Sequence, residues 1–390
     1  MILQSMKYCR FQGERNEWAI EGRPINDEYG QELTFEQINL IVGMNASGKT
    51  NFISVIRQIS DLISGEVKLS NLIYDTANYE LHFKEGQDNI RYLLNFKEGR
   101  VIQETFEING DEKLNRERQE LYYEEIGKKL SYGREDTIVA LSESDSKQQP
   151  FFESLHHWGK NLSHYKFGST LGKDTLIKDI NLIKEDQNIS LKNSNDVTSI
   201  FIKGKLEFGD SFVTAIKDDM RLIGYAISDI NANPLKFIPV SGFGLSVQEE
   251  ELKDTTDQRE MSQGMFRALS LIIQLNYSLM SKTPSCILID DIGEGLDYER
   301  STSLIDLIIK KSEQSSVQII MTTNDRFVMN KIPIKYWTVI KRTSNKSLFY
   351  NYKNSKENFD DFSLTGLNNF EFFATDFFVD GFEEYVKDVK

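Results

Sequence analysis

The stretch "VGMNASGKTNF", residues 42–52, constrains the fold of this chain more than any other feature. Its glycines, lysine and threonine have the spacing of a phosphate-binding P-loop: Gly43, Gly48, Lys49 and Thr50. Residues 38–42, "INLIV", are typical of a buried strand that leads into the loop. From Phe52 to Ile63, apolar residues recur at the spacing of one helix face. A strand, a glycine-rich loop and a helix in this order predict a nucleotide-binding α/β domain.

The loop supplies groups that bind a nucleoside triphosphate and its magnesium ion. Backbone N–H groups at the positive end of a helix surround phosphate oxygens. Lys49 is expected to reach the β- and γ-phosphates, and the Thr50 hydroxyl to ligate Mg²⁺. The expected nucleotide-binding residues of this stretch are Gly43, Asn45, Ala46, Ser47, Gly48, Lys49, Thr50 and Asn51.

Two acids close a second buried strand, "CILID", at residues 286–290. Asp290 is the expected acid on the Mg²⁺ side, holding the ion directly or through water. Asp291 follows, where an acid can orient or deprotonate the attacking water. The alternative is that both acids only end a strand in solvent.

The segment "MSQGMFRALSL", residues 261–271, begins a helix that is apolar around most of its circumference. A serine hydroxyl and free N–H groups at a helix N-terminus, here Ser262 and Gly264, can form a second anion site. Serine is also a common helix cap, so capping alone is the other interpretation of Ser262.

Four motifs in a fixed order resemble one known family. "GMNASGKT", "MSQGMFRAL", "LIDDIGEGLD" and "IIMTTND" are similar to the ATPase heads of the ABC superfamily, in the SMC-like and RecF-like branch that includes stand-alone ATPases of bacterial defence operons. The resemblance covers residues 1–130 and 237–345. It implies an α/β fold: a P-loop ABC-type ATPase head with a mainly parallel, helix-covered sheet, an antiparallel β lobe and a helical insertion.

The resemblance also implies a mechanism with ATP and Mg²⁺ as cofactors. Two heads enclose two ATP molecules, and the loop Gly43–Thr50 of one head faces the signature Ser262, Gln263 and Gly264 of the other. Asp297, in "EGLD", matches the loop that communicates across the interface.

Two positions depart from the family pattern. Asn324 stands where the family usually has a histidine that contacts the γ-phosphate, and Asp291 stands where it usually has glutamate. Asparagine cannot carry the charge of a protonated histidine, and aspartate is one methylene shorter than glutamate. With Lys49, these residues form the expected catalytic set, and we expect hydrolysis to be slow.

The motifs and the hydrophobic patterns divide the chain into four parts. We expect four parts: an N-terminal half of the head with its β lobe (1–134), a largely helical insertion (135–236), a C-terminal half of the head (237–350) and an acidic, Phe-rich segment (351–390). Over 79–132, apolar and polar residues alternate, and glycines recur at the spacing of hairpin turns, which predicts the antiparallel lobe. Helices are expected over 151–167 and 210–230. The sequence has no sustained heptad repeat, so we expect no long coiled-coil arm.

The C-terminal segment is too apolar for a plain disordered tail. Its phenylalanines are Phe359, Phe362, Phe370, Phe372, Phe373, Phe377, Phe378 and Phe382. Either the segment packs back on the domain, or it docks a partner protein.

Composition limits the partners and the location. Hydrophobic residues make up 39% and charged residues 27%, as in a protein with a core, and no apolar run is long enough for a membrane helix. The two distant cysteines and the absence of a signal pattern favour a reduced, cytoplasmic protein without a membrane partner. With a net charge of −14, DNA binding needs a local basic patch. The candidates are Lys160–Lys184 and residues 331–342, although a solvated face with interspersed acids is the favoured interpretation of each.

Two functional hypotheses follow, together with a non-enzymatic one. The first is an ATPase subunit that forms a homodimer or higher homo-oligomer and controls a separate effector protein, such as a nuclease or toxin, in anti-phage defence or DNA maintenance. The second is a RecF-like clamp that binds DNA itself in repair or maintenance. The third is a scaffold that binds ATP without using its hydrolysis.

A histidine cluster and a tryptophan each have both a functional and a structural interpretation. His156, His157 and His164 cluster in the insertion, but no cysteine or carboxylate at metal-ligand spacing accompanies them, so packed or solvated histidines are favoured. Trp18 is a candidate to stack on an adenine, and a core tryptophan is an equally good interpretation.

Overall fold

The computed structural model describes most of the chain. The described residues are 1–25, 28–133, 135–143, 145–178, 193–235, 242–282 and 286–382. They form two compact units. The first comprises Met1–Lys160 and the described residues from Ile332 onward, and the second comprises the described residues of Asn161–Lys331.

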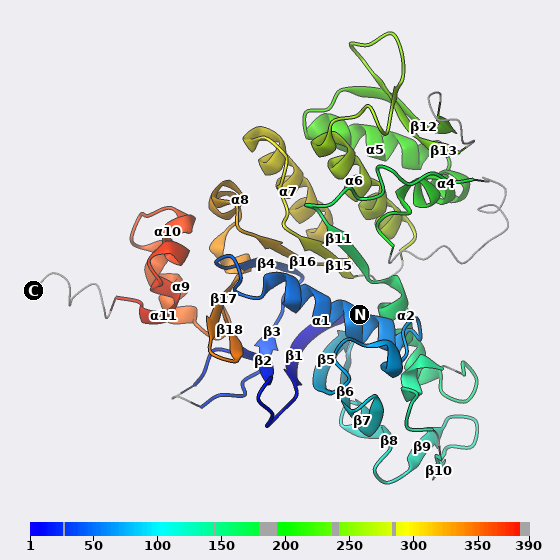
Figure 1. The fold of residues 1–390 in the computed structure, drawn as a ribbon, viewed down its shortest axis with the longest axis vertical. Helices are drawn as coiled ribbons and strands as arrows, with labels where there is room; N and C mark the ends of the chain where they lie inside the picture. Colours follow the sequence, from blue (N-terminus) through cyan, green and yellow to red (C-terminus); the bar gives the residue numbers. More distant parts are fainter. Residues whose placement is uncertain are drawn as a thin grey trace, which may run out of the picture. The chain divides into compact units, whose positions relative to one another are not determined.

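The first unit is built on a mixed sheet, with the strand order β10-β9-β8-β7-β6-β5-β1-β2-β18-β17-β4 and β3 paired to β1 (Figure 1). Its strands are β1 (Ile2–Arg10), β2 (Trp18–Gly22), β3 (Leu33–Thr34), β4 (Ile38–Val42), β5 (Ala77–Glu85), β6 (Asp88–Lys97), β7 (Arg100–Ile108), β8 (Asp111–Asn115), β9 (Glu120–Tyr123), β10 (Lys128–Ser131), β17 (Trp337–Thr343) and β18 (Lys346–Asn351). Its helices are α1 (Lys49–Ile63), α2 (Glu153–Asn161), α9 (Lys356–Ser363), α10 (Asn369–Ala374) and α11 (Phe377–Asp380). Short 3₁₀ turns are η1 (Leu69–Asn71), η2 (Ala140–Ser142), η3 (Pro150–Phe152) and η4 (Ile334–Tyr336).

Strands β5 to β10 form the predicted antiparallel lobe, each pairing with the next. The turn between β7 and β8 contains Asn109 and Gly110, both with positive φ, the backbone conformation that a tight hairpin turn needs. Along β5, buried and half-buried residues alternate, so the strand buries one face and leaves the other partly open. The prediction of a β lobe over 79–132 is confirmed.

The P-loop lies between β4 and α1, as predicted. Every residue of β4 is buried, and the strand pairs in parallel with β17. Helix α1 buries one face, and its Phe52 ring lies 5.0 Å from Phe349 on β18 and 6.0 Å from Phe35. This aromatic packing fixes the start of the helix, and with it the loop, against the sheet.

The Phe-rich segment folds back onto the first unit as helices α9, α10 and α11, which lie beside β17 and β18 (Figure 1). The Phe378 ring is 5.2 Å from Tyr350 on β18, and Lys341 on β17 pairs with Asp376 at 3.1 Å. The described structure therefore supports the first of the two interpretations of this segment, packing on the domain.

Replacing Phe372 by leucine should weaken this packing measurably. Phe372 is fully buried, with its ring 4.6 Å from Phe359 and 4.9 Å from Phe362. Loss of part of the ring should lower the free energy of unfolding by about 1–2 kcal/mol, measured by urea titration. The matched Phe382→Leu change, at a residue 45% exposed, should shift it by less than about 0.5 kcal/mol.

The second unit combines parallel strands with a small antiparallel sheet. Strands β11 (Ser163–Lys166), β15 (Cys286–Asp290) and β16 (Gln318–Thr323) pair in parallel, and β12 (Ile227–Pro234), β13 (Phe243–Glu249) and β14 (Thr256–Asp257) pair antiparallel. The helices are α4 (Val197–Phe208), α5 (Asp210–Leu222), α6 (Gln263–Met280), α7 (Tyr298–Glu313) and α8 (Arg326–Lys331).

A buried polar cluster joins α5, α6 and α7. Asn276 on α6 donates to Asp219 at 2.6 Å, and Lys311 on α7 contacts Asp219 at 2.8 Å and Asn276 at 2.9 Å. Every member has a charged or polar partner, so the cluster satisfies buried groups that would otherwise destabilise the fold. It fixes helix α6, which begins at the predicted signature.

Two predicted helices end earlier than the sequence suggests. The helix expected over 151–167 stops at Asn161, and Ser163–Lys166 is the edge strand β11, because pairing with β15 buries Ser163, His164 and Tyr165. The helix expected over 210–230 stops at Leu222. Gly224 then adopts φ +87, a left-handed conformation that ends helices, before β12 begins.

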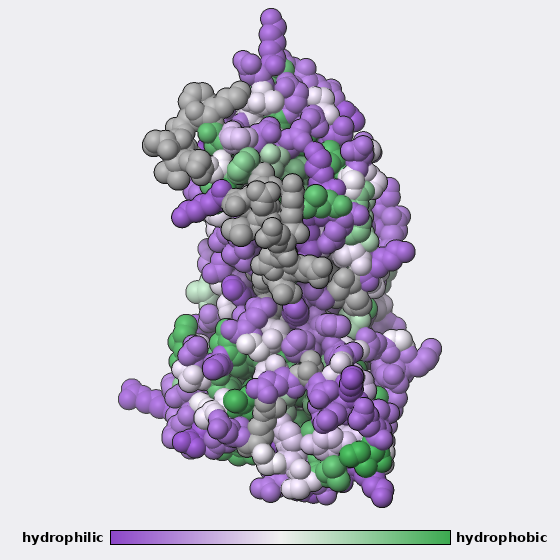
Figure 2. Space-filling view, turned by 90° about the vertical axis from the view of Figure 1, so that its right-hand side faces the viewer, coloured by the Kyte–Doolittle hydropathy of each residue, from purple (hydrophilic) through white to green (hydrophobic). Residues whose placement is uncertain are grey.

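Among the described residues, α6 is the longest helix at 18 residues, so the described chain contains no long coiled-coil arm. None of the described helices combines the length and the hydrophobicity that crossing a membrane requires. Figure 2 shows hydrophilic residues over most of one described face, with hydrophobic residues in small separate groups. Part of the basic stretch Lys160–Lys184, from residue 179 on, lies outside the described residues, as do residues 237–241 at the start of the predicted C-terminal half of the head.

Candidate nucleotide site

The P-loop backbone has the bends that a phosphate cradle requires. Ala46 has φ 63 and Gly48 φ 107, both left-handed, and α1 starts directly after Gly48. A Cβ atom at Gly43 would lie 2.4 Å from Ile340 Cγ2 and 2.7 Å from Ser47 Oγ. Only glycine fits at position 43, because any side chain would collide with Ile340 and Ser47 and disturb the loop.

Polar groups in the loop are arranged for an anion. The buried Lys49 ammonium donates to the carbonyl oxygens of Gly43 at 2.8 Å and Met44 at 3.1 Å, so its charge is held against the loop. Ser47 Oγ is buried and has no hydrogen-bond partner among the described residues. A buried hydroxyl without a partner is costly unless a ligand satisfies it. The loop therefore fits the phosphate groups of a nucleotide.

Trp18 belongs to the core beside the loop. It is 6% exposed, its ring is 6.0 Å from Tyr8, and a Cβ at Gly48 would lie 3.5 Å from Trp18 Cζ2. The guanidinium of Arg10 lies 5.0 Å from the Trp18 ring. Of the two interpretations of Trp18, the structure supports a core tryptophan.

In the second unit, Thr322 on β16 holds the two acids that follow β15. Its hydroxyl donates to Asp290 Oδ1 at 2.6 Å and accepts from the Asp291 backbone N–H at 3.0 Å. Asp290 is 5% exposed, and Asp291 has a positive φ of 57 that turns the chain after the strand. This arrangement holds one carboxylate in a buried position and turns the chain at the next residue, so the strand does not simply end in solvent.

The predicted signature begins helix α6, and Ser262 caps it. Ser262 Oγ accepts from the Met265 N–H at 3.2 Å, and the side chain of Tyr225 lies beside that of Ser262. A Cβ at Gly264 would lie 2.6 Å from the Gly295 carbonyl oxygen and 3.0 Å from Leu296 Cδ2. The signature is therefore packed directly on the loop that leads to Asp297.

Asp297 in turn caps helix α7. Its Oδ1 accepts from the Arg300 N–H at 2.9 Å, and that backbone N–H, with the Arg300 guanidinium, holds the pKa of Asp297 below its usual value. The Arg300 guanidinium lies 4.5 Å from the ring of Tyr225. Tyr225 thus contacts both Ser262 and the partner of Asp297, and links the two predicted interface elements.

Arg267, one turn into α6, fastens the same region. It is 7% exposed and donates to the carbonyl oxygens of Gly168 at 2.8 Å, Ser169 at 3.0 Å and Glu294 at 2.8 Å. Gln263 also donates to Ser169, at 3.1 Å. Burial lowers the pKa of Arg267, with Glu294 opposing, but a guanidinium keeps its charge at neutral pH.

A family comparison decides the identity of this domain. The model described as "AAA domain, putative AbiEii toxin, Type IV TA system" matches residues 38–330, which include the P-loop, the signature, both acids and Asn324. The chain belongs to this family. A comparison of this chain with curated proteins gives no match.

Three solved structures of SMC heads are similar to this chain. The SMC head bound to the C-winged helix domain of ScpA is 16% identical, with 90% of this chain and 97% of that chain covered and a TM-score of 0.53. The SMC head domain from Thermotoga maritima is 15% identical over 90% and 99% of the chains, with a TM-score of 0.43. The Smc head domain with an extended coiled coil from Pyrococcus furiosus, bound to the C-terminal domain of ScpA, is 14% identical over 93% and 99%, with a TM-score of 0.47.

The first of these likenesses confirms the predicted fold class, an α/β head like that of SMC proteins. It also agrees with the resemblance to ABC-superfamily and SMC-like ATPases that the four motifs carry. The AAA domain model and the P-loop geometry together support ATP as the nucleotide, with Mg²⁺ as its usual ion.

The structure brings the predicted site residues into two groups. Residues 43–51 lie together in the first unit, with Asn45, Ala46, Thr50 and Asn51 exposed. Asp290, Asp291, Ser262, Gln263, Gly264 and Asp297 lie in the second unit, as does the exposed Asn324. Their roles in nucleotide chemistry stay predictions.

Three residues that position this site were not singled out from the sequence: Thr322, Arg267 and Tyr225. Thr322 and Arg267 lie inside motifs, "IIMTTND" and "MSQGMFRAL", and their place there is the signal that could have found them. Tyr225 has no such signal. Of the three clustered histidines, His164 is buried on β11 and His157 is exposed on α2. No metal-ligand group among the described residues includes any of them.

Replacing Thr322 by valine should destabilise the chain and weaken Mg²⁺ binding. Valine keeps the shape but leaves the buried Asp290 carboxylate and the Asp291 N–H without their shared partner. We expect a loss of about 1–3 kcal/mol in the free energy of unfolding, measured by urea titration. Thr338→Val, at another buried strand threonine, is the matched control and should cost less. Equal losses in both variants would contradict a special role for Thr322.

Proposed function

We propose that this chain is an ATPase subunit that dimerises around two ATP molecules and controls a separate effector protein in bacterial anti-phage defence. The observation that carries the proposal is the P-loop, in which Lys49 is held against the loop and Ser47 Oγ is left for a ligand. Membership in a family described with a toxin and a toxin–antitoxin system supports an effector of the nuclease or toxin type.

Each site residue has a proposed role. Lys49 binds the β- and γ-phosphates, residues 43–51 provide the cradle, and Thr50 and Asp290 ligate Mg²⁺. Mg²⁺ held by these residues would supply positive charge against the phosphate oxygens. Asp291 orients or deprotonates the attacking water, and Asn324 hydrogen-bonds the γ-phosphate or that water.

The partner head provides the other half of each site. Ser262, Gln263 and Gly264 of one chain face the P-loop of the second chain, and Asp297 communicates across the interface. The support is the direct packing of Gly264 on residues 295 and 296, because one rigid element then carries both predicted interface motifs. Since Asp291 and Asn324 replace the usual glutamate and histidine, hydrolysis is slow and the chain acts as a gated clamp.

The similar SMC head is bound to the C-winged helix domain of ScpA, and by analogy we propose that this chain also binds a protein partner. The proposal is tested by purifying the chain from its native host and identifying the proteins that remain bound with ATP. A nuclease or toxin retained by wild type and released by Lys49→Ala supports it. Brisk phosphate release by the pure chain alone contradicts the slow, effector-coupled cycle.

The second candidate is a DNA clamp of the RecF type, favoured by the SMC-head fold and opposed by the net charge of −14. Salt-dependent binding of plain duplex DNA that needs ATP, and is lost in Lys49→Ala, would favour it over the effector model. ATP-driven assembly without hydrolysis would favour the scaffold instead.

A further inference from the structure

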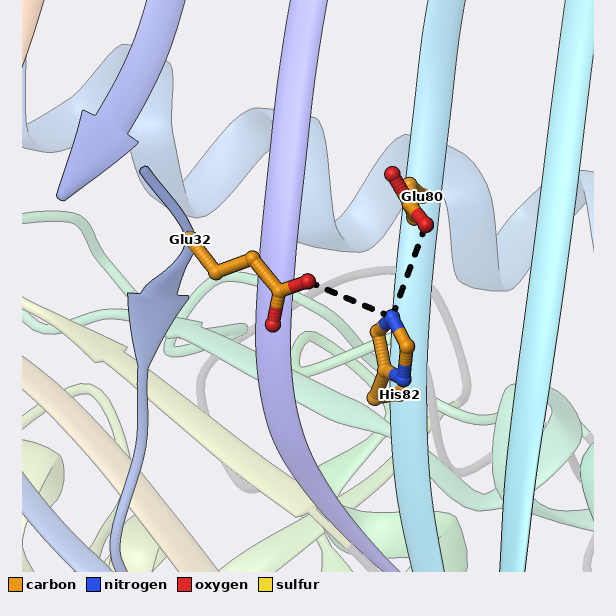
Figure 3. A group of neighbouring side chains, drawn as sticks. All are labelled: Glu32, Glu80 and His82. Carbon is orange, nitrogen blue, oxygen red and sulfur yellow. Dashed lines mark ion pairs between the residues drawn. The ribbon is translucent and has the colours of Figure 1, made fainter. Parts of the chain in front are cut away.

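Three metal-ligating side chains meet on the partly open face of the first unit's sheet. Glu80 and His82 are two residues apart on β5, so they project to the same side, and Glu32 reaches them from the segment before β3 (Figure 3). One ligand atom from each of the three lies within 4.8 Å of the others.

The two distances from the histidine nitrogen to the carboxylates fit a tetrahedral ion. His82 Nε2 is 3.4 Å from Glu32 Oε1 and 3.6 Å from Glu80 Oε1. Two ligands about 2.1 Å from one tetrahedral zinc ion are about 3.4 Å apart. His82 Nε2 is itself buried and makes no hydrogen bond within the described structure. A nitrogen placed between two carboxylates without a hydrogen bond is the arrangement that a bound cation satisfies.

Surrounding residues hold two of the ligands in place. Ser5 Oγ on β1 donates to Glu32 Oε2 at 2.6 Å, which leaves Oε1 directed at His82. Arg91 on β6 contacts Glu80 Oε1 at 2.7 Å, the same oxygen that lies 3.6 Å from His82, and it also contacts Glu107 at 3.3 Å, so a bound cation would share that oxygen with Arg91. Burial opposes the charge of Glu80, but the hydrogen bond and charge of Arg91 outweigh it and lower the pKa of that carboxyl. The contact of Ser5 with the outer oxygen of Glu32 is typical of the outer contacts of metal ligands.

The charge balance leaves room for a divalent cation. Glu32, Glu80 and Glu107 bring three carboxylates, against the guanidinium of Arg91 and the ammonium of Lys7, the cross-strand neighbour of Glu80. The nearby thiol of Cys9 is a poor competing ligand, because burial raises its pKa to about 11 and keeps it protonated.

We infer that Glu32, Glu80 and His82 form a binding site for a divalent transition-metal ion, with Zn²⁺ the best fit to one imidazole and two carboxylates. The site is separate from the P-loop and its Mg²⁺. A bound ion would join the segment before β3 to β5 and would stabilise the folded chain, since it binds the native state.

The test is a Zn²⁺ titration of the untagged, nucleotide-free full chain by calorimetry. Wild type should bind one equivalent, and zinc should raise its thermal unfolding midpoint. His82→Asn and Glu32→Gln should each weaken binding at least tenfold, and Ser5→Ala should weaken it by about tenfold. His157→Asn, at an exposed histidine on α2, and Cys9→Ser should bind as wild type does.

Each variant is first compared with wild type in metal-free thermal unfolding, so that loss of the site is distinguished from loss of the fold. Where His82→Asn lowers the metal-free midpoint, Ser5→Ala and Glu32→Gln decide the question. Absence of saturable binding would overturn the inference and leave His82 as part of an ion pair. Binding that survives in His82→Asn, or is lost in Cys9→Ser, would place the ion elsewhere and overturn it too.

Discussion

Lys49→Ala should abolish nucleotide binding and lower ATP hydrolysis by about 1000-fold or more, the largest effect that we expect of any single change. The wild-type ammonium is buried and held by the carbonyl oxygens of Gly43 and Met44. Alanine removes this charge from the loop, and leaves the phosphates of a bound nucleotide without the ammonium that should hold them. Binding is measured with a fluorescent ATP analogue, and turnover by phosphate release.

The matched control for this variant is Arg57→Ala on the same helix. Arg57 is 45% exposed and pairs with Asp61 of the same helix at 3.6 Å, so its loss should leave binding and turnover unchanged. If Lys49→Ala bound ATP as tightly as Arg57→Ala, the P-loop would not be the nucleotide site.

Gly264→Ala should leave ATP binding to the single chain intact and abolish ATP-driven assembly. The added methyl group would lie 2.6 Å from the Gly295 carbonyl oxygen and 3.0 Å from Leu296, too close for either atom. The start of α6 and the loop before Asp297 must then move apart, and both carry predicted interface residues. Because a group supplied in trans can contribute about 10³-fold to phosphoryl transfer, turnover should fall by a similar factor.

Gly133→Ala serves as the control for the added methyl group, since a Cβ at position 133 meets no atom within 4 Å. Assembly is measured by light scattering with ATP. A Gly264→Ala chain that assembles like Gly133→Ala would show that the signature takes no part in the interface.

The sequence predicted those parts of the fold whose physical cause is local. The run "INLIV", the glycines of the loop and the apolar face of α1 each determine their own structure, so strand, loop and helix came out as expected. The hairpins of the lobe were predictable for the same reason, because turn residues such as Asn109 and Gly110 mark them.

Contacts between distant segments were not predictable in this way. Ser163–Lys166 forms a strand because it pairs with β15, and nothing in "SHYK" indicates that pairing. Thr322 meets Asp290 across two parallel strands, and Tyr225 meets Ser262 through the tertiary fold. Glu32 and His82 are fifty residues apart in sequence and are adjacent only because β3 and β5 both pair with β1.

The central claim is that the ATP site is composite and needs two copies of the chain. The most direct test is the mass of the particle with and without ATP and Mg²⁺, using Asp291→Asn to slow hydrolysis and hold the ATP-bound state. The account predicts one chain, 45.1 kDa, without nucleotide, and at least twice that mass with ATP. A particle of one chain under both conditions would contradict it.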